Sequence, residues 1–146
     1  MSPEQIFFLL PKKGKFLASF TEQLRPQADA VWRSLDDWTP WLLIIMAILG
    51  IGLAAYYYKP YNDMPGRHYK VSHWAVWGII SVVLIFIATL CIEYFGIKTH
   101  LPKSGLNNIY ILTALNNAIY CAILYFVTSV VWCIAGPTNA YRLFKP

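Results

Sequence analysis

The chain has 146 residues, of which 58% are hydrophobic and only 13% are charged, and its formal net charge is +5. Soluble domains carry about 25% charged residues, and the charges here avoid three long windows, which excludes an ordinary soluble domain and indicates an integral membrane protein. The twelve Lys and Arg residues are scattered over the other segments without an extended basic patch, so nucleic acid is not an expected partner.

Residues 1–40 are predicted to form an amphipathic, interfacial leader. Apolar side chains recur at helical spacing after Lys15, opposite polar ones, and the periodicity continues beyond Pro26. A stripe of this kind binds the surface of a membrane, and it also fits a helix that packs against a partner protein. The sequence leaves both possibilities open. The candidate docking residues are Phe16, Leu17, Phe20 and Leu24.

The first predicted membrane span covers residues 41–58. Its length corresponds to roughly 27 Å of helix, enough for a hydrocarbon core, and aromatic residues flank both ends as in an interfacial belt. Thr39 followed by Pro40 predicts a helix start, as an N-cap and first-turn pair. Gly50 and Ala54 lie four residues apart, and small residues at this spacing permit close approach of another helix. We therefore take Gly50 and Ala54 as helix-contact candidates.

A turn-rich loop over residues 59–70 precedes the second predicted span, residues 71–94. Glu93 is the only acidic residue in a predicted span, and such a residue indicates function by default. Its position beside Tyr94 and near Lys98 favours an interfacial carboxylate, with a proton relay as the alternative.

The third predicted span covers residues 115–135 and ends before Gly136 and Pro137. Two asparagine pairs lie in or beside it: Asn107 with Asn108, and Asn116 with Asn117. An unpaired amide in hydrocarbon costs several kcal/mol and requires a partner. The pairs are nine residues apart, which places them on opposite helix faces and argues against one pore-lining seam. The first pair is predicted to be interfacial, whereas the second fits either the interface or the hydrocarbon.

A weaker stripe follows one face of this third helix. Small and polar side chains at positions i, i+4, i+8 and i+15 share that face, and such residues mediate helix association in lipid. The stripe is predicted to contact another helix of the chain or of a second subunit. The candidates are Thr113, Asn117, Cys121 and Thr128.

Catalytic, metal-binding and cofactor-binding motifs are not found in the sequence. The three cysteines have neither disulfide-framework nor zinc-ligand spacing, and the three histidines are predicted at the edges of the membrane, where they cannot ligate a haem at mid-depth. These residues are Cys91, Cys121, Cys133, His68, His73 and His100. Phosphate-binding loops and nucleophile elbows are also absent. The chain is therefore predicted not to be an enzyme and to need no cofactor or metal.

The predicted fold is an all-α integral membrane protein in which three transmembrane helices follow the interfacial leader. The predicted domains are the leader at 1–40, a three-helix membrane domain at 41–136 and a basic, aromatic tail at 137–146. Lys and Arg residues divide almost evenly between the two sides, so the positive-inside rule gives no orientation. The long leader favours a cytoplasmic N-terminus in a bacterial inner (cytoplasmic) membrane.

Two functions fit a small multi-span protein without catalytic groups. The favoured one is a non-catalytic structural or scaffolding subunit of a larger membrane complex, such as a secretion, envelope-spanning or respiratory assembly. The alternative is a homo-oligomeric channel or a membrane-disrupting pore-forming effector. The expected partners are membrane lipids and either other membrane-protein subunits or further copies of the chain.

Overall fold

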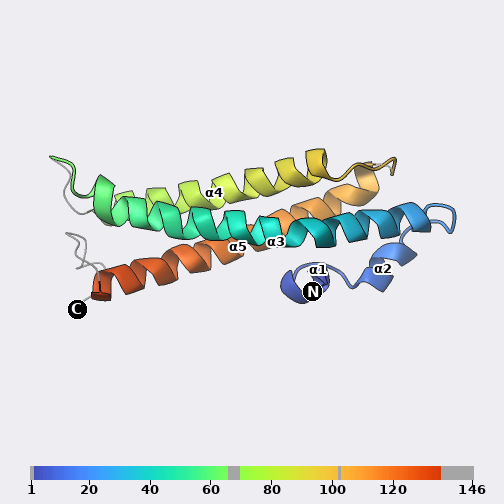
Figure 1. Ribbon diagram of the computed structural model, residues 1–146, viewed down its shortest axis with the longest axis horizontal. Coiled ribbons are helices and arrows are strands. Elements are labelled where there is room, and N and C mark those ends of the chain that lie inside the picture. Colours follow the sequence, from blue (N-terminus) through green and yellow to red (C-terminus); the bar gives the residue numbers. More distant parts are fainter. Residues whose placement is uncertain (1, 66–69, 102, 136–146) are drawn as a thin grey trace. The chain divides into compact units, whose positions relative to one another are not determined.

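The computed structural model describes residues 2–65, 70–101 and 103–135, with side chains omitted at 103 and 104, and within these ranges all regular structure is helical (Figure 1). The all-α prediction is therefore confirmed for this part of the chain. The predicted tail at 137–146 and His68 lie outside the described residues.

The helices follow one another in the order α1 (Pro3–Ile6), α2 (Lys13–Ala18), α3 (Arg25–Tyr56), a π-helical turn η1 (Tyr57–Tyr61), α4 (Val71–Gly96) and α5 (Lys103–Ala135) (Figure 1). Three helical stretches, at 25–61, 71–96 and 105–135, are long and apolar enough to cross a membrane. The predicted number of such helices is confirmed for the described residues.

The predicted helix start at Thr39 and Pro40 is wrong, because Pro40 lies inside α3. The hydroxyl of Thr39 does not cap a helix but donates a hydrogen bond to the carbonyl oxygen of Leu35, at 2.7 Å. Pro40 removes one backbone hydrogen bond from the helix interior. The helix continues through it because Leu35, Thr39 and Leu42 form one fully buried face. The second half of the leader and the first span are thus a single helix.

The true start of α3 is at Arg25, with Pro26 in its first turn, where the missing N–H of proline costs no hydrogen bond. The first half of the leader forms the two short helices α1 and α2. At the start of α1 the backbone N–H of Ser2 donates to the side-chain oxygen of Gln5, at 3.2 Å.

Helix α5 begins twelve residues before the predicted third span, at Lys103 instead of residue 115. The apolar stretch before residue 115 is therefore a helical extension of the same span. With 33 residues α5 is about 50 Å long, and α3, with 32 residues, is about 48 Å long. Both helices exceed the length of about 30 Å that a hydrocarbon core requires.

The chain divides into two compact units. Unit 1 comprises residues up to 44 and residues 86–117, and unit 2 comprises residues 45–85 and the chain from 118 onward. Unit 1 thus contains α1, α2, the first part of α3, the last turns of α4 and the first half of α5. The predicted division into leader, membrane domain and tail stays a prediction.

Unit 2 has an aromatic core. Tyr57 and Tyr58 are fully buried and meet edge to face, with ring centroids 4.9 Å apart. Four partly buried aromatic residues pack against this pair and Cys133: Tyr61, Trp74, Trp77 and Trp132. The aromatic end of the first predicted span therefore forms a packed cluster within the chain.

Gly78 lets Tyr125 approach the backbone of α4 within unit 2. A Cβ atom at Gly78 would lie 3.1 Å from Cε1 of Tyr125, and the Tyr125 hydroxyl is held by a hydrogen bond to the carbonyl oxygen of Trp74, at 3.0 Å. We expect Gly78→Ala to lower the free energy of unfolding by about 1 kcal/mol, because the ring must shift. Gly52→Ala is the control, since nothing lies within 4 Å of its added Cβ. If the two variants have the same midpoint temperature of thermal unfolding in detergent, this packing is refuted.

Candidate functional site

A layer of buried polar side chains lies between helices of unit 1, and we call it the polar layer. It draws two residues from α4 and four from α5, and all are fully buried or nearly so. Its members are Thr89, Glu93, Tyr110, Thr113, Asn116 and Asn117.

Asn117 ties three helices of unit 1 together. Its side-chain amino group donates to the hydroxyl of Thr89 on α4, at 3.1 Å, and to the carbonyl oxygen of Leu42 on α3, at 3.4 Å. The amide of Asn117 therefore has partners within the chain. These contacts offset the cost of removing its amino group from water.

Asn116 joins the leader to α5. Its side-chain oxygen accepts a hydrogen bond from the backbone N–H of Leu9, at 3.2 Å, across 107 positions of sequence. Leu9 lies between α1 and α2, where no helical carbonyl is available to its N–H, and a backbone donor without a partner is costly. Asn116 is thus a functional candidate that the sequence-based contact stripe missed. The one signal for it was the amide pair inside an apolar run.

Glu93 is enclosed by the chain, with a side chain that is 0% exposed, although the sequence predicts an interfacial carboxylate. The carboxyl group faces the hydroxyl of Thr113, but that hydroxyl donates to the carbonyl oxygen of Ile109, at 2.9 Å. Neither carboxyl oxygen of Glu93 has a hydrogen-bond partner among the described residues. The position of Glu93 near the end of α4 gave no indication that its carboxyl group is buried, because the way α4 packs against α5 determines this burial.

Three further polar atoms of the layer are buried without a hydrogen-bond partner in the described part of the chain. They are the hydroxyl of Tyr110, the side-chain nitrogen of Asn116 and the side-chain oxygen of Asn117. Each such group costs about 1–3 kcal/mol. A native structure that retains several of them in one place, around a buried acid, identifies a candidate functional site.

The first half of the leader, which contains α1 and α2, packs on longer helices of its own chain. Phe16 is 4% exposed, and its ring centroid lies 5.4 Å from that of Trp32 on α3 and 5.1 Å from that of Phe20. Phe20 in turn covers Gly105 of α5, where an added Cβ would lie 2.8 Å from the ring. The other two docking candidates, Leu17 and Leu24, are half-buried.

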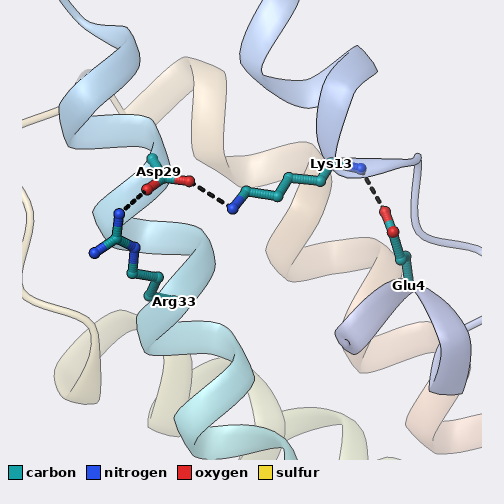
Figure 2. Close-up of polar contacts among 4 residues, drawn as sticks. All are labelled: Glu4, Lys13, Asp29 and Arg33. Carbon is teal, nitrogen blue, oxygen red and sulfur yellow. Dashed lines mark hydrogen bonds and ion pairs between the residues drawn. The ribbon is translucent and has the colours of Figure 1, made fainter. Parts of the chain in front are cut away.

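Charged groups also hold the leader in unit 1. Figure 2 shows Lys13 between two carboxylates: its backbone N–H donates to Glu4, and its amino group pairs with Asp29 on α3, at 2.6 Å. Arg33 pairs with the other oxygen of Asp29. The hydrogen bond from Lys13, followed by that from Arg33, lowers the pKa of Asp29, which lies outside the predicted span.

Acid is therefore expected to loosen α2. Because the pKa of Asp29 is lowered in the folded chain, its ion pairs stabilise the fold above the unfolded pKa of about 3.9 and are lost as the pH falls through the folded value. The effect should be small, since the pair with Lys13 is partly exposed. Protease sensitivity of residues 12–18 should rise at low pH in the wild type but not in Asp29→Asn. Asp37→Asn, at an exposed position of α3, should behave like the wild type, and a loss of the pH response there would refute the assignment.

The remaining helix-contact candidates lie in unit 2. A Cβ atom at Gly50 would lie 3.4 Å from the carbonyl oxygen of Cys121, so α3 and α5 approach closely there. The thiol of Cys121 lies 3.0 Å from the hydroxyl of Ser81 on α4. Ala54 is fully buried and Thr128 is half-buried. A role for any of these residues between subunits stays a prediction.

An apolar groove runs along α4 and α5 in unit 2. Its volume is about 400 Å³, and both small and aromatic side chains line it. The groove is lined by Ala75, Gly78 and Val82 of α4 and by Ala122, Tyr125 and Phe126 of α5, among others.

Metal-ligating residues do not cluster in the described ranges, where no group of three or more His, Cys, Asp or Glu could hold a metal ion. His73 contacts the hydroxyl of Tyr61 through its Nδ1 atom, at 3.2 Å. Protein-family models, curated proteins and solved structures provide no match to the chain. Any functional conclusion therefore depends on the side chains described above.

Proposed function

We propose that the chain is an integral membrane protein and acts as a non-catalytic structural or scaffolding subunit of a larger membrane complex. The observation that carries this proposal is which side chains of the long helices are buried and which are exposed. Polar side chains in the middle of the candidate spans, namely Ser81, Thr89, Asn116, Asn117 and Ser129, are buried within the units, whereas large apolar side chains are exposed on all three long helices. The exposed ones include Ile44, Ile48, Ile51, Val76, Ile79, Val83, Ile87, Ile123, Val127, Val131 and Ile134.

This arrangement supports a subunit over a pore. A conducting oligomer needs polar or charged side chains that face away from each chain to line a water-filled path. Among the described residues, Ser81, Thr89, Asn117 and Ser129 are fully buried instead. The outward apolar faces suit lipid chains and apolar helices of partner proteins.

The apolar groove is the docking position that we propose for a transmembrane helix of a partner subunit. Helices associate in lipid through small residues that allow close approach, and Ala75 and Ala122 supply them here. The aromatic rings of Tyr125 and Phe126 provide contact area beside the small residues. A secretion, envelope-spanning or respiratory assembly would supply such a partner.

Filling the groove tests this function. Ala122→Trp places an indole in the groove and should abolish co-purification of partner subunits from mild detergent. Ile123→Trp is the matched control, because it adds the same ring at the next residue, which is exposed and does not line the groove. Unchanged co-purification with Ala122→Trp, in a protein that unfolds at the wild-type temperature, would contradict the proposal.

Three crossings place the two termini on opposite sides of the membrane, and we propose a cytoplasmic N-terminus in a bacterial inner membrane. A cysteine introduced at Ser2 should be protected from a membrane-impermeant thiol reagent in intact cells, whereas a C-terminal cysteine should react. The three native cysteines are replaced in both proteins. Reaction of both introduced cysteines, or of neither, would refute three crossings.

A further inference from the structure

Among the described residues, Glu93 has no partner of opposite charge. The ion pairs among the described residues join other groups, and the titratable groups beside Glu93 are Tyr110 on α5 and Tyr94, the next residue of α4. The turn of α3 that bonds to the polar layer contributes the carbonyl of Leu42, which does not titrate. The leader contributes the backbone N–H of Leu9, which is bonded to Asn116. An ionised Glu93 would therefore be an uncompensated charge in a closed layer.

The hydrogen-bond directions in the layer favour a neutral acid. Thr113 gives its only hydrogen to the carbonyl oxygen of Ile109, and in this rotamer its hydroxyl oxygen is an acceptor for a hydrogen bond from a protonated Glu93. A carboxylate has no hydrogen to donate, whereas a carboxylic acid has one. The side-chain oxygen of Asn117, one turn from Thr113, is a second buried acceptor without a donor. Asn116 and Tyr110 hold unpartnered donors elsewhere in the layer, but at Thr113 only a proton on Glu93 supplies one.

A cavity lies at the end of α4, and Tyr94 and Tyr110, which line it, are the titratable neighbours of Glu93. The cavity has a volume of about 110 Å³, enough for a few water molecules, and is lined by Tyr94, Ile97, Thr99, Leu101, Leu106 and Tyr110. Tyr110 lines the cavity and interacts electrostatically with Glu93, and its hydroxyl is buried without a hydrogen-bond partner among the described residues. A phenol hydroxyl both donates and accepts a hydrogen bond, as a proton relay requires.

We propose that Glu93 is a reversible proton-binding site, which is occupied at neutral pH and exchanges its proton with solvent through Tyr110 and the adjacent cavity. In the loading step a hydronium ion in the cavity gives a proton to the Tyr110 hydroxyl. The two groups are not in hydrogen-bond contact in this structure, so a side-chain rotation or one intervening water molecule closes the gap before the phenol passes its own proton to a carboxylate oxygen of Glu93. One O–H bond forms at Glu93, a water molecule remains in the cavity, and the net charge of the layer becomes zero. This site is independent of the proposed scaffolding function.

Infrared spectroscopy of the full chain in lipid vesicles tests the occupancy. At neutral pH the wild type should show the C=O stretch of a neutral carboxylic acid, and Glu93→Gln should lose it. Glu22→Gln, at an exposed position, should retain the band. If Glu93→Gln fails to fold, wild-type protein can be treated at neutral pH with a hydrophobic carbodiimide, which adds to protonated carboxyl groups, and mass spectrometry should find the adduct on Glu93. A wild type with neither the band nor the adduct would overturn the proposal.

The relay has its own test in the rate of hydrogen–deuterium exchange at this carboxyl group. After transfer to D2O, Tyr110→Phe should slow the isotope shift of the band by about tenfold or more, because the ring keeps its packing but loses its relay hydroxyl. Tyr120→Phe, elsewhere on α5, should leave the rate unchanged. An unchanged rate in Tyr110→Phe would overturn the route. A sodium-dependent rise in wild-type thermal stability that Glu93→Gln lacks would overturn the proton site in favour of an alkali-ion site.

Discussion

Phe16→Ala is expected to release α1 and α2 from the long helices of unit 1. Phe16 is almost fully buried against Trp32 and Phe20, and truncation of a buried phenylalanine costs about 3–5 kcal/mol. The short helices α1 and α2 have little stability of their own, because helices of fewer than about 12 residues are marginal in water. Their amide hydrogen exchange should therefore rise strongly, while exchange in the middle of α4 stays slow.

Leu17→Ala is the control for this variant. Leu17 is the next residue of α2 and is only half-buried, so its truncation removes less contact area and should raise exchange far less. If both variants exchange alike, or if neither differs from the wild type, the leader does not dock through Phe16.

Asn117→Leu is expected to lower the free energy of unfolding by about 1 kcal/mol, because it removes two buried hydrogen bonds and leaves Thr89 and Leu42 without their donor, a loss that removal of the unpartnered side-chain oxygen only partly offsets. Hydrogen bonds between membrane helices average about 0.6 kcal/mol each, so the loss of two of them accounts for a destabilisation of about this size. Unfolding in mixed detergent with increasing dodecyl sulfate measures the difference.

Asn108→Leu provides the matched control on the same helix. Asn108 belongs to the other asparagine pair and is exposed, so its replacement should change the unfolding free energy by less than about 0.5 kcal/mol. Equal destabilisation by the two variants would show that enclosure of Asn117 is not what stabilises unit 1. A change in oligomeric state alone, with normal unfolding of the chain, would instead assign Asn117 to a contact between subunits.

The number of long helices and the bounds of α4 could be predicted because both depend on local composition. The predicted span at 71–94 differs from α4 by two residues at its end, since an apolar window bounded by loops leaves little choice. The continuity of α3 could not be predicted in this way. A threonine followed by a proline fits a helix start and a helix interior equally well, and burial of Leu35 and Leu42 decides between them.

The polar layer was only partly predictable, because it depends on contacts between distant segments. The sequence placed Thr113 and Asn117 on one face, and periodicity is enough for that. It gave no indication that Leu9 reaches Asn116, since 107 positions separate them. The environment of Glu93 could not be predicted either. The packing of α4 against α5 encloses this side chain, and its distance from the end of the predicted span does not reveal that packing.

If the polar groups in the middle of the spans serve contacts within the chain and leave an apolar exterior, the chain alone should conduct no ions. Native mass spectrometry from mild detergent, combined with an ion-flux assay on the purified chain in vesicles, distinguishes a scaffolding subunit from a pore. We expect a complex of fixed stoichiometry with other membrane proteins and no ion flux from the chain alone. A single homo-oligomer that conducts ions and has no co-purifying partner would contradict the proposed scaffolding function.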